Sequence, residues 1–73
     1  SIQLYVTNQN EINVTANQTE LQAIYISDMT GRTWHYDASG THVKIRPPVV
    51  NGVYTVRVIG SETTRIEKVI LNK

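Results

Sequence analysis

Two histidines and one aspartate lie close together in the middle of the chain, and imidazole and carboxylate groups are common ligands of zinc. His35 and His42 belong to neighbouring strand-like runs, and Asp37 falls between them. A catalytic zinc needs three protein ligands in close geometry and an open position, and nothing here supplies a convincing third ligand. We therefore expect exposed histidines, with His35 on the solvent side of its strand, and neither a metal nor a cofactor.

Other arrangements of catalytic residues do not emerge from the sequence. The chain has no Ser/His/Asp order typical of a triad, no paired catalytic carboxylates, and four isolated glycines in place of a phosphate-binding loop. It has no cysteine, which excludes a thiolate nucleophile, a disulfide and a thiolate metal site. With 73 residues the core is thin and leaves little stability for a water-excluding pocket. We expect no catalytic residues and no enzyme.

Charge and aromatic content narrow the classes of ligand. Seven basic and six acidic residues give a net charge of +1, too weak to attract a nucleic acid, and no apolar run is long enough to span a bilayer. The basic residues are scattered, although alternation gives Arg57 to a solvent face that could collect several of them. Four large aromatic side chains could form a sugar-binding platform, but we favour core positions or half-buried cross-strand partners for them: Tyr5, Tyr25, Trp34 and Tyr36.

Alternation of apolar and polar residues runs along nearly the whole chain, and no helical stripe competes with it. Valine, isoleucine and threonine supply 9, 8 and 9 residues, whose branched side chains favour strands. The pattern predicts seven strands, near residues 2–7, 11–16, 21–28, 32–36, 42–46, 53–59 and 63–71. In the last one Ile66 and Ile70 share one face while Val69 and Leu71 share the other, which predicts a bulge or burial on both faces.

Turn residues separate these strands. Residues 28–31 and 37–40 share the pattern D-x-[ST]-G, in which the Asp side chain accepts a bond from the amide two residues later and the Gly takes a positive φ. Both predict type I turns closed by a glycine bulge, and Gly60-Ser61 predicts a two-residue type II′ turn. Residues 46–52 contain Pro47-Pro48, which cannot donate to a ladder, so we expect a semi-rigid crossover there.

Seven short strands with a proline-bearing crossover predict an all-β fold, an immunoglobulin-like two-sheet antiparallel β-sandwich. The length allows one domain only, covering residues 1–73. The chain begins with Ser1 in place of methionine, so we expect a domain processed or excised from a longer protein.

Three blocks of sequence carry a more specific signal. An apolar strand ends in Asp28-Met29-Thr30-Gly31-Arg32, Gly52-Val53-Tyr54 opens an alternating strand, and Lys68-Val69-Ile70-Leu71-Asn72-Lys73 ends the chain. In order and spacing these blocks resemble the C-terminal sorting domain of type IX secretion cargo, over the stretch from Leu21 to Lys73. That family shows D-x-x-G-[RK] after an apolar strand, then G-x-Y, and finally a lysine-bearing last strand.

The resemblance implies a C-terminal secretion signal without chemistry of its own. Such a domain is recognised in its folded form by the type IX (Por) outer-membrane translocon. A sortase-like peptidase commonly removes it, and the cargo is then attached to the cell surface. The implied partners are this translocon and that peptidase, and the implied location is the periplasm in transit, then the outer membrane, the cell surface or the medium.

The resemblance also implies roles for seven residues: Asp28, Gly31, Arg32, Gly52, Tyr54, Lys68 and Lys73. Asp28 and Gly31 hold the turn that projects Arg32. Gly52 permits a backbone conformation closed to other residues, and Tyr54 begins its strand with a hydroxyl that bonds outward. Lys68 and Lys73 belong to an exposed last strand, which the secretion machinery contacts by strand addition.

Two alternatives stay open. The runner-up is an immunoglobulin-like or fibronectin-like module of a surface protein, acting as a spacer or as a carbohydrate-binding module. Uncovered terminal strands could also be exchanged between copies, which would give a strand-exchanged homodimer at high concentration.

Overall fold

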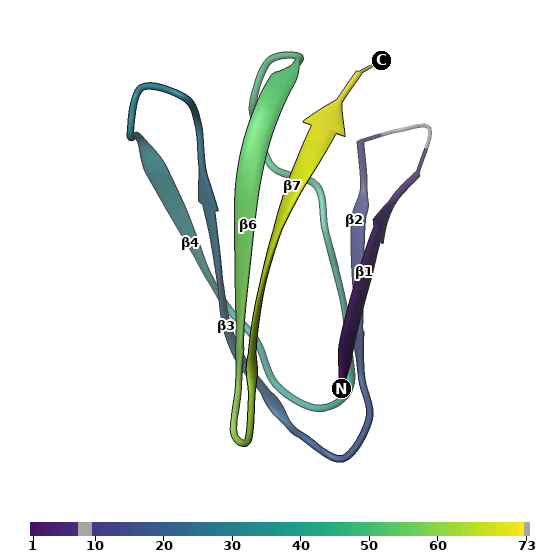
Figure 1. Ribbon diagram of the computed structural model, residues 1–73. Coiled ribbons are helices and arrows are strands. Elements are labelled where there is room, and N and C mark those ends of the chain that lie inside the picture. The colour runs from purple at the N-terminus through teal and green to yellow at the C-terminus, as the bar shows by residue number, and fades with distance from the viewer. Residues whose placement is uncertain (8–9, 73) are drawn as a thin grey trace.

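The computed structural model describes residues 1–7 and 10–72, and seven strands make up the described fold (Figure 1). They are β1 (Ile2–Val6), β2 (Ile12–Ala16), β3 (Leu21–Ser27), β4 (Thr33–Asp37), β5 (His42–Ile45), β6 (Gly52–Gly60) and β7 (Thr64–Leu71). A three-stranded sheet has the order β1-β2-β5, and a four-stranded sheet has the order β4-β3-β6-β7. All neighbours are antiparallel. The predicted all-β, two-sheet sandwich is confirmed, with every strand end within one residue of its expected place.

The chain passes between the two sheets three times, through the connections β2–β3, β4–β5 and β5–β6. This path is immunoglobulin-like, because two antiparallel sheets pack face to face and the chain crosses repeatedly from one sheet to the other. It leaves β1 and β7 as edge strands on the same side of the sandwich. There the Arg65 guanidinium donates from Nη1 to the carbonyl of Ile2 over 3.3 Å, which joins the two sheets across that side.

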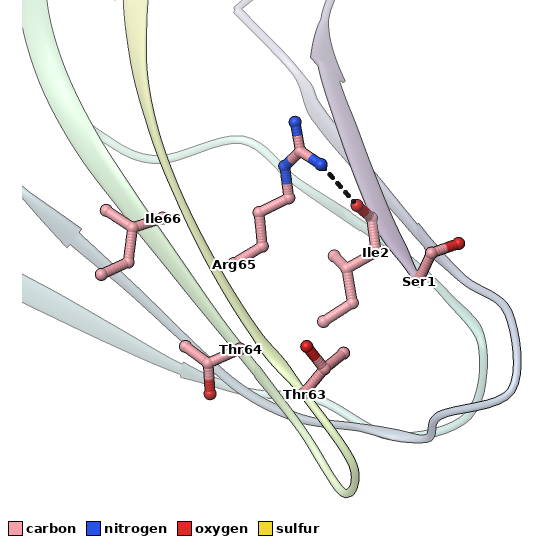
Figure 2. Close-up of a pocket in the computed structure, with 6 residues that line it drawn as sticks. All are labelled: Ser1, Ile2, Thr63, Thr64, Arg65 and Ile66. Carbon is pink, nitrogen blue, oxygen red and sulfur yellow. Dashed lines mark hydrogen bonds between the residues drawn. The ribbon is translucent and has the colours of Figure 1, made fainter.

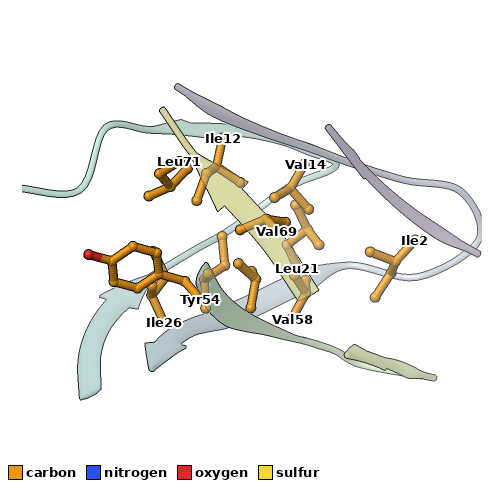
Figure 3. Close-up of a cluster of buried hydrophobic side chains, with 11 residues drawn as sticks. Ile2, Ile12, Val14, Leu21, Ile26, Tyr54, Val58, Val69 and Leu71 are labelled. Carbon is orange, nitrogen blue, oxygen red and sulfur yellow. The ribbon is translucent and has the colours of Figure 1, made fainter. Parts of the chain in front are cut away.

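One face of each strand supplies the core, and side chains from both sheets meet in the space between them (Figure 3). The buried members of this core are Ile2, Ile12, Val14, Leu21, Ile24, Ile26, Tyr54, Val56, Val58, Val69 and Leu71. Partly buried residues pack around them, among them Leu4, Trp34, Tyr36 and Val43. Because burial of apolar area is the main stabilising term in such a fold, the branched residues that predicted strands are also those that hold the two sheets together.

The last strand differs from its predicted form. β6 and β7 pair without interruption from Gly52 opposite Leu71 to Ile59 opposite Thr64, so the bulge predicted in β7 is wrong. The register shift of this sheet lies in β3 instead, between Leu21 and Ala23. Burial on both faces is also wrong, because the outer-face side chains Ile66 and Ile70 are 64% and 69% exposed.

The connection over residues 37–40 is not the closed turn that its D-x-S-G pattern predicts. Asp37 is the last residue of β4, paired with Ala23, and the chain then crosses to the other sheet. The backbone bonds of this connection go to β3: Ala38 donates to Gln22, and Gly40 accepts from Leu21. The predicted type I turn is therefore wrong, although Gly40 has the expected positive φ of 72°.

The turn between β6 and β7 has a glycine because a side chain at that position would have no room. Gly60 donates from its N–H to the carbonyl of Thr63 over 2.8 Å, so Ser61 and Glu62 are the central residues of the turn. Gly60 has no positive φ, and the predicted type II′ turn is wrong. A Cβ at Gly60 would lie 2.6 Å from Oγ1 of Thr19, so the close approach of the β2–β3 connection requires glycine there.

Candidate recognition surface

The three sequence blocks meet at one end of the four-stranded sheet (Figure 1). Ser27, the last residue of β3, pairs with Thr33 on one side and with Thr55 on the other, and Thr55 pairs with Lys68. The β3–β4 turn, the start of β6 and the last part of β7 therefore lie together. We call this end of the sheet the motif end; it consists of residues 28–34, 52–55 and 68–71.

Asp28 organises the β3–β4 turn. Its Oδ1 accepts three hydrogen bonds, from the amide of Thr30 at 2.9 Å, the hydroxyl of Thr30 at 2.8 Å and the amide of Arg32 at 2.9 Å. Its backbone closes the turn, since the carbonyl accepts from the N–H of Gly31 and the amide donates to the carbonyl of Arg32. Gly31 has a φ of 94°, a left-handed value that glycine adopts without strain. The predicted turn with a glycine of positive φ is confirmed here.

These bonds also set the charge of Asp28. The hydroxyl of Thr30 lowers the pKa of the Asp28 carboxyl below its ordinary value of 3.8, and bonds from the Arg32 and Thr30 amides and the Arg32 side chain act in the same direction. Desolvation raises this pKa, and its effect is smaller than that of the Thr30 hydroxyl but larger than that of each other bond. The reason is that hydrogen bonds to a carboxylate favour its charged form. The Asp28 carboxylate is therefore negatively charged at neutral pH, and its hydrogen bonds hold it in place.

Arg32 presents a restrained cation at the motif end. Its Nε lies 3.2 Å from Oδ2 of Asp28, and its side chain is 75% exposed. The guanidinium carbon also lies 5.4 Å from the centre of the Trp34 ring, a cation–π arrangement. Ion pair and ring together limit the conformations of the arginine while its other nitrogens stay accessible. Such preorganisation lowers the entropy cost of binding a partner.

Tyr54 joins this surface to the core. Its ring is 5% exposed and meets Trp34 edge to face, with 6.4 Å between centroids. Its hydroxyl donates to the carbonyl of Val50, four residues earlier in the β5–β6 crossover. The expectation that this hydroxyl bonds outward is wrong, because the ring lies between the sheets. The same arrangement, a tyrosine bonded to the backbone a few residues upstream, occurs at a corner of immunoglobulin-like sandwiches.

Gly52 precedes Tyr54 at the start of β6, and its backbone is not reserved for glycine. Positive φ values among the described glycines occur at Gly31 and Gly40. A Cβ at Gly52 would meet the Tyr54 ring at 3.6 Å, an ordinary van der Waals distance. The expected glycine-only conformation at Gly52 is wrong, and its Cβ position simply faces the ring.

Lys68 lies on the exposed outer face of β7, next to Thr55. β7 is an edge strand, as the predicted strand addition requires. Its end is nevertheless attached to the fold, since Leu71 is fully buried and the amide of Asn72 donates to Oδ1 of Asn10. Lys73, the other predicted contact residue, lies outside the described residues.

Trp34 is the member of the motif end that the sequence analysis missed. Its aromatic character predicts a core or half-buried position, and it is partly buried against the core. Its second contact is with Arg32, which lies two residues earlier in the chain. In extended backbone, residues two apart have their side chains on the same face. That spacing is the signal that could have indicated the pair.

The histidines are exposed, as predicted. His35 lies on the outer face of the four-stranded sheet, with Nε2 3.4 Å from Oδ1 of Asp37. Asp37 and His42 line one open hollow of about 420 Å³ beside the β4–β5 connection. Within residues 1–7 and 10–72, no three His, Cys, Asp or Glu side chains are grouped so that they could hold a metal.

Tyr25 is the centre of a stack on the same outer face. The His35 ring lies 4.8 Å from the Tyr25 ring at 22°, and the Arg57 guanidinium carbon lies 4.8 Å from the ring centre. Because β3 lies between β4 and β6, these two groups cover opposite faces of Tyr25.

Trp34 and Tyr36 are half-buried toward the core, as predicted. Burial raises the pKa of the Tyr36 hydroxyl.

Tyr5 departs from the prediction of a core position. It lies on the outer face of the three-stranded sheet and is 57% exposed. It is on the opposite layer from the Tyr25 stack. The four aromatic side chains are thus divided among two outer faces and the core, and they do not form one sugar-binding platform.

No family model matches the chain, and no curated protein gives a significant match. In the part of the chain that the structure describes, no helix is long and apolar enough to cross a membrane.

Proposed function

We propose that this domain is a non-catalytic secretion signal that directs cargo through the type IX outer-membrane translocon and is then removed by a sortase-like peptidase. The observation that supports this proposal is the convergence of the three sequence blocks at the motif end. Blocks that are far apart in the sequence meet at one end of the sheet, where Arg32 is exposed beside Trp34, Lys68 is exposed on the outer face and β7 is an edge strand. The cargo passes through the periplasm and reaches the outer membrane, the cell surface or the medium.

The proposed surface suits recognition of a folded domain. A translocon that selects cargo after folding needs side chains whose positions are set by the fold. Arg32 meets this need, because Asp28 and Trp34 restrain it from two directions. Lys68 lies on the same end of the sheet, two strands away from β3, and offers a second positive charge. The translocon surface would then carry complementary acidic groups.

Deletion of the final residues is a poor test of this role. Leu71 is fully buried in the core, and Asn72 is bonded to Asn10. Truncation before Ile70 therefore removes core packing as well as the tail, and a failure of export would not distinguish recognition from unfolding. Substitutions of exposed side chains avoid this problem.

The test fuses a periplasmic reporter to Ser1 and expresses the fusion in a host with a type IX system. Surface display is measured by the accessibility of the reporter to added protease. We expect display of the wild-type fusion, and a clear reduction for Arg32→Gln and for Lys68→Gln. Lys44→Gln is the matched control, because Lys44 is an exposed lysine on β5 of the other sheet. A wild-type reporter that stays in the periplasm while the domain is folded would contradict the proposal.

A spacer module is the second candidate. Ser1 and the end of β7 lie at opposite ends of the molecule (Figure 1), whose longest dimension is 32 Å. Domains with termini at opposite ends can be joined head to tail in an extended chain. A spacer would leave the reporter in the periplasm of the same host, so one experiment separates the two candidates.

A further inference from the structure

The free edge of β7 has backbone groups without a strand partner. In the described sheet β7 pairs with β6 alone. The bond from Gly60 to Thr63 is the first of the β6–β7 ladder, and bonded and non-bonded pairs alternate along an antiparallel ladder. Four residues of β7 therefore direct their N–H and C=O groups away from β6: Thr64, Ile66, Lys68 and Ile70.

At one end of this edge the backbone is already hydrogen-bonded, and at the other end it borders open space. The next position in the same alternation is Asn72, and its N–H is taken by the Asn10 side chain. Toward the β6–β7 turn the edge borders an open hollow of about 380 Å³, lined by β7 residues and by the start of β1 (Figure 2). Thr64 and Ile66 both line this hollow.

The side chains along this edge alternate in character. Arg65 and Glu67 lie on the inner side, where Nη2 of Arg65 is 2.9 Å from Oε1 of Glu67. Ile66 and Lys68 lie on the outer face, and Ile66 is 64% exposed. Figure 2 shows Arg65 and Ile66 on opposite sides of the strand, with Arg65 reaching toward Ile2. Inward charges can protect an edge from pairing with other sheets. A partner strand whose charges follow the complementary order would place an opposite charge beside each of these two residues.

We propose that the partner of this edge is a second copy of the same chain, paired antiparallel through β7 without exchange of strands. A two-fold axis passes beside Ile66, so that Ile66 lies opposite the partner's Ile66. Thr64 then lies opposite the partner's Lys68, and each such pair exchanges two backbone hydrogen bonds. The two four-stranded sheets become one continuous sheet, with Arg65 opposite the partner's Glu67 on the inner side.

Charge selects this register among its neighbours. Backbone alternation permits shifts by two residues only. A shift in one direction places Glu67 opposite the partner's Glu67, and a shift in the other places Arg65 opposite the partner's Arg65. A shift by four residues in one direction places Lys68 opposite the partner's Lys68. In the other direction it places Thr64 opposite the partner's Thr64 and needs the amide of Glu62, which is already bonded to Thr19. Larger shifts need the amide of Asn72 or residues of the β6–β7 turn, which are already bonded. Like charges opposite each other destabilise a strand pair, so the register centred on Ile66 is favoured.

The test measures the association of the full chain by sedimentation equilibrium over a series of concentrations up to millimolar. We expect a monomer–dimer equilibrium for the wild type. Arg65→Glu and Glu67→Arg each put like charges opposite one another twice, and each should raise the dissociation constant by about tenfold or more. A mixture of the two variants should restore the dimer, because one chain then has arginine at both positions and the other has glutamate at both. An intrachain role of the Arg65–Glu67 pair cannot give this result.

A second measurement keeps the proposal testable if a charge variant fails to fold. Amide hydrogen exchange of the wild type should show concentration-dependent protection of Thr64, Ile66 and Lys68. Three outcomes would overturn the proposal: a wild-type monomer at every concentration, exchange at these amides that does not depend on concentration, or a mixture of folded variants that stays monomeric. A dimer that survives both single substitutions would indicate strand exchange and would also overturn it.

Discussion

The side-chain oxygen of Asn10 accepts a 2.8 Å hydrogen bond from the backbone N–H of Asn72. This bond joins the β1–β2 connection of one sheet to the end of β7 in the other sheet. Asn10 is 5% exposed and has a φ of 57°, a left-handed conformation that asparagine tolerates better than most residues. The neighbour of Asn72 is the fully buried Leu71, so the bond holds the last strand where the core needs it.

Asn10→Ala should lower the free energy of unfolding by about 2 kcal/mol. About 1 kcal/mol comes from the lost hydrogen bond, and about 1 kcal/mol from placing alanine in a left-handed conformation. Urea denaturation of both proteins measures the difference. Asn10→Gly is the matched control, because glycine keeps the backbone conformation and loses the bond alone, and it should cost about half as much. Equal stability of Asn10→Ala and the wild type would show that the bond is not formed.

The charge of Asp28 should make the stability depend on pH in the acid range. Its folded-state pKa lies below 3.8, so the carboxylate stabilises the fold above pH 3.8, and this contribution is lost as the pH falls through the lower folded-state value. Asp28→Asn should therefore lower the melting temperature at neutral pH and reduce the further loss on acidification. Thermal denaturation from pH 7 to pH 2 measures both effects. Asp37→Asn, at an aspartate that is 96% exposed, should leave the melting temperature at neutral pH unchanged.

Alternation along the sequence was enough to predict the layers and strands of this fold. Period-two patterning decides which side chains lie between the sheets, as Val56 and Val58 show, and turn residues separate the strands. One error arose because a glycine can serve either a turn or a close contact. Gly60 satisfies a turn pattern, but the contact that requires glycine comes from Thr19, which is distant in sequence. Local patterns carry no information about such a contact.

The candidate site was predicted in part for the same reason. The Asp28 turn is local, so its pattern sufficed to predict the bond from the Thr30 amide to Asp28 and the positive φ of Gly31. The orientation of Tyr54 depends on the packing of two sheets and on the path of the crossover, which brings the carbonyl of Val50 to its hydroxyl. No pattern within one strand specifies that approach, and the outward hydroxyl was the wrong choice.

Tyr54→Phe should lower the free energy of unfolding by about 1 kcal/mol. The ring stays in the core, but the hydroxyl that bonds Val50 is lost and leaves a carbonyl without this donor. For a domain of this size the melting temperature should fall by roughly 4–8 °C. Tyr5→Phe removes a hydroxyl from a tyrosine that is 57% exposed and should change the stability by less than about 0.5 kcal/mol. Equal effects of the two variants would rule out the buried bond.

Gly60→Ala and Gly52→Ala should differ clearly, although both add one methyl group to β6. At Gly60 the new Cβ would lie 2.6 Å from Oγ1 of Thr19 and 3.0 Å from the carbonyl oxygen of Thr63. Rotation of Thr19 could relieve the first contact only by breaking its bond from the amide of Glu62, and the second contact is with backbone. We expect a loss of about 1–3 kcal/mol in the free energy of unfolding.

The Gly52→Ala variant adds its methyl group at an ordinary contact distance from the Tyr54 ring. Its stability should lie within about 0.5 kcal/mol of the wild type, because neither the available space nor φ opposes alanine there. Urea denaturation of the two variants side by side gives the comparison. If Gly52→Ala were the more harmful substitution, the close packing of the β2–β3 connection against the β6–β7 turn would be wrong. The backbone of β6 would then need its glycine at the motif end instead.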